Sequence, residues 1–543
     1  MEIPVKIVIG LIFPVLSTII YFVVRRPWRS YFVSGLLFLF SLLVLGVSRV
    51  EVLGPVNDSF FFPLMFSVED SYANLLRFAL ALTGSAVLLY NASLKDRLFH
   101  IAVIWAISSG MILTLAENFL TFFLFWEMVT LSTAGIIFLA KDDRAYKNGI
   151  IYLLTHLTGG LFLLLGILKH YDATGSLLLE RPQAGIAFFL VAIGIKTAFI
   201  PLHFWLVVGY PSASWRGTVV LSTLSTKVGV YAVARVLEPT LVVAYMGGIM
   251  AVFGVLMALL QKKMRPLLCY HIISQVGYMV AGVGLGLALS VDGGLLHLLN
   301  HMLYKALLLM SAGAVIYAVG TEKLKYLGSL ARKIPVVSVT ALIGSLAISG
   351  FPPFNGFISK TMLKYGTENE RILSLLLLIA GVGTVMSFSK FMYFGFLRTR
   401  EKSEEKIKVK TLPWGMKFAL IFTSVLVVLL GVFPNILRTL TPYQSSTFVY
   451  SLSAVRESLL IGGAGVCLFI ILKPLLDPRS EFMIHRLLGL FNSKLDSLSG
   501  TVYVRAKNSV LKDGVVNTSS SLWFILFAAG LFISFFLINI LLI

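Results

Sequence analysis

Cysteine is nearly absent from this sequence. Only Cys269 and Cys467 occur among its 543 residues. An iron–sulfur cluster usually takes about four cysteine ligands, and two cysteines in a chain of this length do not suggest a disulfide framework. We therefore expect no redox cofactor, and no cofactor of another kind, in this chain.

Charged residues are also scarce. They make up 13% of the chain, whereas 58% of the residues are hydrophobic and the mean hydropathy is +0.91. This composition is too apolar for a soluble globular protein and predicts a chain embedded in a lipid bilayer. The formal net charge of +20 does not indicate nucleic-acid binding, because the basic residues lie mostly in short loops beside apolar segments, where they set membrane topology.

The apolar segments predict an all-α polytopic membrane protein. A bilayer-spanning helix requires roughly 20 apolar residues. We expect sixteen such helices, at 3–24, 30–49, 71–92, 98–116, 118–140, 148–168, 184–208, 214–237, 240–260, 267–289, 294–317, 335–362, 371–396, 414–434, 455–474 and 520–543. The first is too long for the apolar region of a signal peptide and has no small-residue cleavage site after it, so we expect it to be retained.

Basic residues favour one face of the predicted bundle. They follow the spans that end near residues 24, 92, 140, 260, 317 and 396, whereas opposite loops such as RVEVLGPVNDS and SVDGG hold fewer. Cytoplasmic loops carry an excess of lysine and arginine. We therefore expect both termini to lie on the non-cytoplasmic side of the cell membrane.

Residues 478–516 interrupt the series of apolar spans. Met483, Leu487, Leu488 and Leu490 would share one apolar helix face, which is typical of a helix lying along the membrane surface. Three glycines in the segment disfavour a continuous helix. A cytoplasmic connector is therefore an equal alternative.

Three ionisable residues fall inside predicted spans without a local partner. Lys196 lies in GIKTAFIPLHFW, Lys227 in STLSTKVGVYAVARV and Glu127 in FFLFWEMVTLSTAGIIF. Charge in a bilayer core is costly, so it indicates a polar or hydrated interior. A lysine bonded to a carbonyl of a neighbouring helix is the structural alternative. We expect Glu127 to pair with Lys196 and to control how firmly that lysine holds its proton.

One predicted span carries three titratable side chains on a single face. His297, His301 and Lys305 recur every four residues in HLLNHMLYKALLL, about 6 Å apart by helical rise. One or two waters between successive groups would complete a proton relay. Histidines at this spacing can also bind metal, but no carboxylate or cysteine accompanies them, so we expect no metal site.

Prolines interrupt two of the predicted spans. AFIPLHFW contains Pro201, and GFPPFNGF contains Pro352 and Pro353; proline removes a helical hydrogen bond. Broken helices in corresponding places of two halves indicate the ion path of an inverted-repeat transporter. Lys196 precedes the first break and Lys360 follows the second. This placement fits two opposed half-channels.

Several segments resemble conserved blocks of the antiporter-like membrane subunits shared by respiratory complex I, Mrp cation/proton antiporters and membrane-bound hydrogenases or related archaeal sulfur-reducing complexes. They are FWEMVTLSTAGIIF, KTAFIPLHFWL, STKVGVYA, SQVGYM, HLLNHMLYKALL and GFPPFNGFISK, in the family's order, between about residues 98 and 396. The resemblance implies fourteen core helices that contain two inverted five-helix repeats, with helices 7 and 12 broken.

The resemblance also implies roles in ion translocation for individual residues. In chain order they are the carboxylate of helix 5 (Glu127), the lysine of broken helix 7 (Lys196), the connecting lysine of helix 8 (Lys227), the relay of helix 11 (His297, His301, Lys305) and the terminal lysine of helix 12 (Lys360). We assign secondary roles to His203, His271 and Lys390.

The chain departs from the family pattern near helix 7. VVGYPSAS follows PLHFWL, so Tyr210 stands where the family commonly has a second histidine. The sequence therefore does not define the proton route near helix 7. Lys263 stands where the family usually has an acidic or neutral residue, and LLCYHII adds His271. These departures suggest a branch such as the hydrogenase-like or sulfur-reducing archaeal complexes.

Six regions are expected along the chain. They are 1–97 (helices 1–3), 98–240 (first inverted repeat), 241–400 (second inverted repeat), 401–477 (helices 14 and 15), 478–516 (an amphipathic segment that resembles the lateral-helix extension of some family members) and 517–543 (a C-terminal transmembrane helix).

Three functions are compatible with these features. The first is an ion-translocating subunit of a redox complex, moving protons or exchanging them for sodium. Its partners would be other antiporter-like and small membrane subunits and iron–sulfur or hydrogenase-like peripheral subunits, so the chain would belong to an oxidoreductase or translocase complex without a redox centre of its own. The second is a Mrp-type antiporter subunit with no redox partner. The third, a non-transporting membrane scaffold, is disfavoured by the intact set of protonatable groups.

Overall fold

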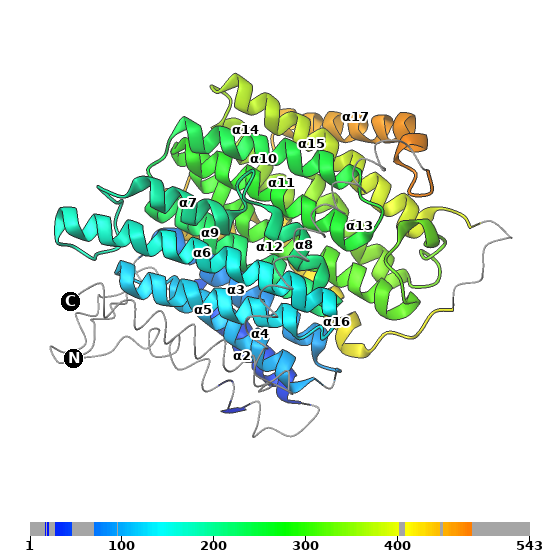
Figure 1. Ribbon diagram of the computed structural model, residues 1–543. Coiled ribbons are helices and arrows are strands. Elements are labelled where there is room, and N and C mark those ends of the chain that lie inside the picture. Colours follow the sequence, from blue (N-terminus) through cyan, green and yellow to red (C-terminus); the bar gives the residue numbers. More distant parts are fainter. Residues whose placement is uncertain are drawn as a thin grey trace.

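The computed structural model shows a bundle of α-helices (Figure 1). It describes residues 17, 19–20, 28–45, 70–94, 96–400, 408–445 and 449–480. Within these residues, ten helices are long and apolar enough to cross a membrane, so the chain is a multi-span membrane protein. The expected spans 3–24 and 520–543 and the amphipathic segment 478–516 lie almost wholly outside the described residues.

The described helices follow the order of the expected spans. They are α2 (Arg29–Leu45), α3 (Ser71–Asn91), α4 (Arg97–Leu113), α5 (Phe119–Phe138), α6 (Asp143–Thr174), α7 (Ile186–Thr197), α8 (Phe204–Gly209), α9 (Trp215–Val236), α10 (Leu241–Leu259), α11 (Met264–Leu285), α12 (Ala288–Val319), α13 (Pro335–Ser349), α14 (Asn355–Gly366), α15 (Arg371–Met392), α16 (Trp414–Val432) and α17 (Leu452–Leu476). Short helical turns occur at Tyr210–Ser212 (η1), Leu324–Tyr326 (η2), Tyr393–Leu397 (η3) and Pro434–Leu440 (η4).

Polar caps make some helices longer than their apolar centres. Asp142 accepts a hydrogen bond from the N–H of Ala145 at the start of α6, and Gly175, with left-handed backbone, ends that helix. Such caps satisfy backbone groups that have no partner within the helix. α6 therefore covers 32 residues rather than the expected 148–168. α12, which has no side-chain cap at its start, also covers 32 residues rather than 294–317.

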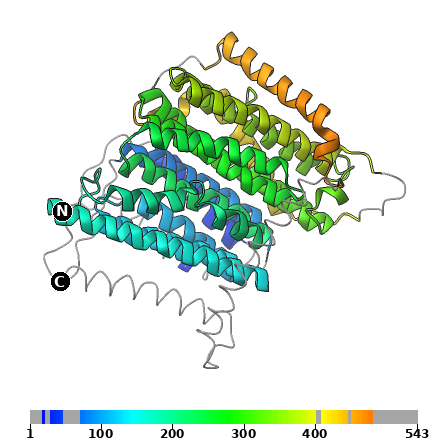
Figure 2. The same cartoon turned by 45° about the horizontal axis from the view of Figure 1, so that its top comes forward.

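α12 occupies the centre of the bundle. It packs against α3, α9, α11, α13, α14 and α16. Figure 2 shows α6 near one edge of the described bundle and α17 at the opposite edge, with α9 and α12 between them. α6 packs against α5 and α7, while α17 packs against α15. Side chains of α9, α11 and α12 therefore point into the protein interior rather than towards lipid.

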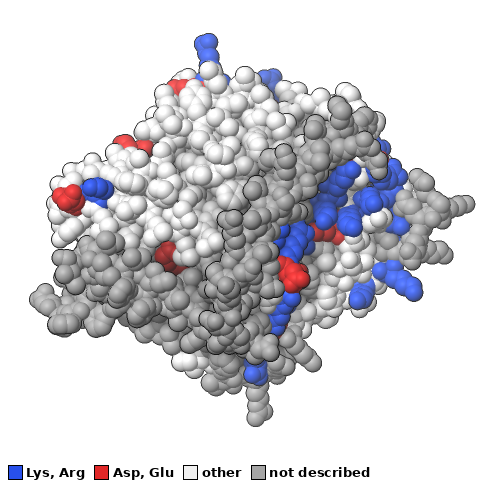
Figure 3. Space-filling model, in the orientation of Figure 1, with Lys and Arg blue, Asp and Glu red and all other residues white. Residues whose placement is uncertain are grey.

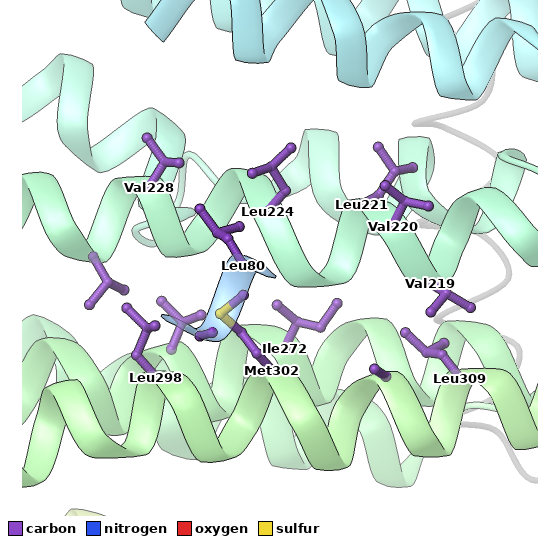
Figure 4. Packing of buried hydrophobic residues seen from close by; sticks show 14 of the residues in the cluster. Leu80, Val219, Val220, Leu221, Leu224, Val228, Ile272, Leu298, Met302 and Leu309 are labelled. Atoms are coloured by element: carbon purple, nitrogen blue, oxygen red, sulfur yellow. The ribbon is translucent and has the colours of Figure 1, made fainter. Parts of the chain in front are cut away.

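Aliphatic side chains fill the space between α3, α9 and α12. Leu80, Leu224 and Met302 meet there (Figure 4), each at most 1% exposed. α10 and α11 approach each other more closely, through glycines: a Cβ atom at Gly277 would lie 2.5 Å from the backbone nitrogen of Ala251. Small residues at contacts of this kind are typical of helices packed in membranes.

Basic loops meet at one end of the bundle. The backbone N–H of Leu324 donates to the carbonyl of Lys262, and that of Ser329 donates to the carbonyl of Arg398, so the α10–α11 loop, the α12–α13 loop and the end of α15 lie together. Figure 3 shows lysine and arginine gathered on this side of the surface. We call it the basic end, formed by residues 141–147, 260–265, 320–334 and 398–400.

Candidate functional site

The first broken span is interrupted directly after Lys196. α7 ends at Thr197, Ala198 has left-handed backbone (φ 64°), and the N–H of Phe199 donates to the carbonyl of Gly194 at 2.8 Å. Pro201 has no N–H to offer the carbonyl of Thr197, and the residue before a proline disfavours helix. The helix therefore ends one residue after Lys196, whereas the position of Pro201 suggested an end about one helical turn further on.

The second break repeats this geometry. α13 ends at Ser349, Gly350 has left-handed backbone (φ 83°), and the N–H of Phe351 donates to the carbonyl of Leu346 at 3.0 Å. The segments AFIP (198–201) and GFPP (350–353) therefore correspond residue by residue. In each, the peptide bond before the last proline is cis.

The ammonium group of Lys196 lies against α5. It is fully buried, and its Nζ donates to Thr130 Oγ1 at 2.7 Å and to the carbonyl of Trp126 at 3.3 Å. The ring centre of Trp126 is 4.5 Å away. Among the described residues no ion pair joins Lys196 to Glu127, although the two charges act on each other. Lys196 thus binds the residues that flank Glu127 on α5, not its carboxylate.

The carboxylate of Glu127 points towards α6. The side chain is 4% exposed, and neither carboxylate oxygen has a hydrogen-bond partner among the residues that the structure describes. A Cβ atom at Gly160 of α6 would overlap with Oε1, so the glycine provides the space that the carboxylate occupies. An unpaired carboxylate in this setting costs free energy, which is a feature of functional sites.

Lys227 is held by its own helix. It is fully buried in α9, and its Nζ donates to the carbonyl of Ser222 at 2.5 Å and to Thr226 Oγ1 at 2.9 Å. The structural alternative, a lysine bonded to a carbonyl of a neighbouring helix, describes a contact of Lys196 but not those of Lys227. Its charge remains available to groups on α12.

His297 joins three helices. Its Nδ1 lies 2.8 Å from Ser359 Oγ of α14, and its Nε2 lies 3.2 Å from Gln275 Oε1 of α11 and 3.2 Å from the Tyr304 hydroxyl. All four side chains are fully buried. This polar network links α12 to the second half of the second broken span.

His301 and Lys305 continue along the same face of α12. Within the described part of the chain, neither ring nitrogen of the fully buried His301 has a hydrogen-bond partner, and the positive charges of Lys227 and Lys305 both act on this ring. Lys305 Nζ donates to the carbonyl of Leu268 in α11 at 2.9 Å. His301 is therefore near the lysine of α9 and one helical turn from that of α12.

Lys360 lies beside the second break. It is half-buried in α14, and its Nζ donates to the carbonyl of Ile348, in the last turn of α13, at 2.7 Å. The ring centre of Tyr278 is 5.0 Å away. The ammonium group thus binds one of the carbonyls that the end of α13 leaves without a helical donor.

The three residues with expected secondary roles have different contact partners. His203 is half-buried before α8, and its ring centre is 4.8 Å from that of Phe253. His271 Nε2 lies 2.8 Å from Ser387 Oγ of α15. Lys390 Nζ donates to the carbonyls of Leu259 at 2.6 Å and Gln261 at 2.8 Å. Lys390 therefore caps the C-terminal end of α10 at the basic end.

Sequence reasoning missed the neutral partners of these groups. Thr130, Gln275, Tyr304 and Ser359 bind the predicted ionisable residues. Their sequence signal is helical spacing: Thr130 follows Glu127 by three residues and Tyr304 follows His297 by seven. In the described part of the chain, no group of three histidine, cysteine, aspartate or glutamate side chains could hold a metal ion.

Two equally broken helices flanking a set of buried ionisable groups define a membrane subunit of the antiporter-like class. Residues 116–387 match the family described as NADH:quinone oxidoreductase/Mrp antiporter, transmembrane region. The chain belongs to this family, which confirms the resemblance found in its sequence blocks.

Relatives in this family come from several kinds of proteins. An uncharacterised protein of Methanocaldococcus jannaschii is 30% identical over 66% of this chain and 79% of its own length. One of the Na(+)/H(+) antiporter subunits of Alkalihalophilus pseudofirmus is 29% identical over 54% of this chain and 65% of its own. A hydrogenase-4 component of Escherichia coli is 31% identical over 47% of this chain, which spans 43% of that protein.

Solved structures share the fold. A chain of the Mrp complex from Dietzia sp. has a TM-score of 0.74 at 20% identity and covers 84% of this chain and 100% of its own length. A chain of the membrane-bound sulfane sulfur reductase, an archaeal respiratory complex, has a TM-score of 0.70 at 20% identity and covers 84% of this chain and 98% of its own length. A chain of Thermus thermophilus respiratory complex I has a TM-score of 0.71 at 23% identity and covers 84% of this chain and 100% of its own length. These proteins are subunits of multisubunit membrane complexes.

Proposed function

We propose that this chain is an ion-translocating subunit of a multisubunit membrane-bound redox complex. It moves protons, or exchanges protons for sodium, while partner subunits transfer electrons. The observation that carries the proposal is the row of buried groups formed by Lys196, Lys227, His301 and Lys305, all 0% exposed. Four ionisable side chains in a membrane interior are costly, and such residues mark ion or proton pathways.

Two inverted five-helix repeats account for the arrangement of the helices. The first repeat, residues 98–240, contains α4 to α9, and the second, residues 241–400, contains α10 to α15. The third helix of each repeat, α6 or α12, has 32 residues, and the fourth span of each is broken with the same backbone geometry. Together with the spans outside the described residues, this supports sixteen transmembrane helices.

The proposed path runs across the bundle through these groups. Glu127 and Lys196 form the first site, Lys227 and His301 connect it to Lys305, and the His297–Ser359 contact leads to Lys360 beside the second break. Ala198, two residues after Lys196, has left-handed backbone and forms a joint. A small rotation there would move the ammonium group between the carboxylate of Glu127, which attracts it, and Lys227, which repels it. Lys196 would thus pass its proton inward.

A Mrp-type antiporter subunit without a redox partner is the second candidate. The similarity to a Na(+)/H(+) antiporter subunit favours it, whereas the similarity to a hydrogenase component favours the redox complex. Purification of the intact complex separates the two: iron–sulfur or hydrogenase-like subunits would copurify with this chain in the first case and not in the second.

In this proposal the basic end faces the cytoplasmic side of the cell membrane. Basic loops favour the cytoplasm, and the lipid bilayer surrounds the helices. Peripheral subunits of the redox complex would bind at this end. Other antiporter-like and small membrane subunits would contact the lateral faces, and both termini would lie on the opposite side.

Substitution of Lys227 tests the proposed function. In proteoliposomes that contain the whole complex, with a pH-sensitive dye trapped inside, Lys227→Met is expected to abolish ion translocation while assembly is retained, because methionine fills similar space without a charge. Lys169→Met, which alters an exposed lysine of α6, is the control. If the complex that contains Lys227→Met translocated ions normally, the ions would not need this chain's buried lysine, and the non-transporting scaffold would be favoured.

A further inference from the structure

Polar residues recur every four positions along α6. Asn148, Tyr152 and His156 lie on one face and are 2%, 0% and 1% exposed. Gly160 follows on the same face, and the carboxylate of Glu127 lies against it. The face begins near the basic end and reaches Glu127 after twelve residues, about 18 Å by helical rise. It therefore leads from one membrane surface to the first proposed ion site.

Polar atoms on this face lack hydrogen-bond partners in the described part of the protein. Asn148 Oδ1, His156 Nε2 and both Glu127 carboxylate oxygens are buried and unpaired there. Tyr210, in η1, faces the same region from the side of α8, with its ring centre 6.4 Å from that of Tyr152. Buried polar groups normally have partners, so unpaired groups in succession indicate a route for water or protons.

The Tyr152 hydroxyl already belongs to a chain of hydroxyl groups. It lies 2.9 Å from Thr133 Oγ1 of α5 and 2.6 Å from Ser225 Oγ of α9. Thr133 is one helical turn from Thr130, whose hydroxyl accepts a hydrogen bond from Lys196. Hydroxyl groups in such a chain can each accept one proton and donate another.

His156 is placed between this hydroxyl chain and the ion site. Its ring centre is 4.4 Å from that of Tyr152 and 4.3 Å from that of Trp205, and the charge of Lys196 acts on it. Its Nε2, unpaired among the described residues, is therefore available to exchange a proton with the groups on either side of it.

We propose that His156 is a further proton-carrying residue, which forms with Tyr152 and Tyr210 the entry route from the basic end to Glu127 and Lys196. The inference rests on the proposed function. A proton from water at the basic end binds one imidazole nitrogen, and the proton on the other nitrogen leaves for Glu127 or Lys196. Each tyrosine hydroxyl likewise accepts one proton and releases one.

The test compares variants with matched controls in the intact complex. His156→Gln keeps a polar side chain that cannot carry a proton, and Tyr152→Phe keeps the ring but loses the hydroxyl. His170→Gln changes another fully buried histidine of α6, 14 residues further along the helix. Tyr90→Phe removes a buried hydroxyl that binds only the carbonyl of Met310 among its described contacts, at 2.7 Å. Lys196→Ala is measured beside them as a reference without translocation.

Proton translocation is measured in proteoliposomes with a trapped pH-sensitive dye, driven by whichever electron donor or imposed sodium gradient drives the wild-type complex. Translocation per assembled complex should fall by about tenfold or more in His156→Gln and Tyr152→Phe, as expected when a proton-transfer group is lost. The two controls should stay near wild type. Thr133→Ser, which keeps the hydroxyl, should translocate better than Thr133→Val, which keeps the volume; a packing role predicts the reverse order.

Two outcomes would overturn the inference, and they are distinguishable. Wild-type rates in His156→Gln and Tyr152→Phe, with Lys196→Ala inactive, would remove the entry route and leave the proposed function standing. Wild-type rates in Lys196→Ala as well would contradict both the entry route and the proposed function. If His156→Gln fails to assemble, Tyr152→Phe and the Thr133 pair decide the outcome alone.

Discussion

Individual residues in this protein combine close packing with unpaired charge. Within the described residues Glu127 has no hydrogen-bond partner for its carboxylate, and its position depends on the absence of a side chain at Gly160. Lys196 binds a hydroxyl and a carbonyl of α5 instead of this carboxylate. Neither group is therefore held by the other, and the proposed transfer of protons through this site requires such an arrangement.

The carboxylate of Glu127 needs the space above Gly160, and this gives a prediction about a single residue. Gly160→Ala should lower the thermal unfolding midpoint of the purified complex, since overpacking of an interior costs about 1–3 kcal/mol. In a Glu127→Ala background the same change should cost much less, because the new methyl group no longer meets the carboxylate. The measurement is a double-mutant cycle on the unfolding midpoint.

Gly463→Ala in α17 is the control for this cycle. A Cβ atom at Gly463 would have no neighbour within 4 Å among the described residues, so the unfolding midpoint should hold or rise. Equal destabilisation by Gly160→Ala with and without Glu127 would show that the carboxylate does not occupy the space above the glycine.

At the scale of helices, the ends of the elements carry most of the information about function. Both broken spans end with a left-handed residue and the same backbone hydrogen bond, and a lysine lies beside each break. The prolines in the sequence predicted that the spans would break. They did not predict that α7 ends at Thr197, because the reversal at Ala198 depends on tertiary packing and not on proline alone. α6 likewise exceeds its expected length because Asp142 and Gly175 cap it outside the apolar segment.

Lys390 provides the test of helix ends. Its ammonium group donates to two carbonyls at the end of α10, where a positive charge also favours the helix dipole. Lys390→Met should leave these buried carbonyls without a donor and destabilise the complex by about 1–3 kcal/mol. Thermal unfolding of the purified complex measures this, with Lys169→Met as the exposed control. An unfolding midpoint equal to that of the wild type would argue against the capping role.

For the whole molecule, the exposed basic residues and the buried ionisable groups occupy different regions. Basic loops gather at one end (Figure 3), while the buried ionisable groups cross the interior between α5 and α14. The sequence predicted most of the described spans and the basic loops between them, because hydropathy and charge are local properties. It could not predict the partners of the buried ionisable residues: His297 binds Ser359, 62 positions away, and only the packing of the helices brings them together.

The orientation of the bundle is tested on one helix. In a chain with Cys467 replaced by serine, Asp143→Cys lies at the basic end of α6 and Asp172→Cys near its other end, both at exposed positions. A membrane-impermeant maleimide should label residue 143 from the cytoplasmic side of oriented membrane vesicles and residue 172 from the opposite side. The reverse pattern would invert the proposed topology. Labelling of both residues from one side would contradict a membrane-spanning α6.

The central claim is that Lys196 must release its proton for ions to move. An arginine at this position would keep the positive charge but essentially never release a proton. The most direct measurement is the ion gradient built by proteoliposomes that contain the complex with Lys196→Arg. The account predicts normal assembly, normal electron transfer to artificial acceptors in any redox partners, and no gradient. A gradient of wild-type size would show that Lys196 is structural and would contradict the account.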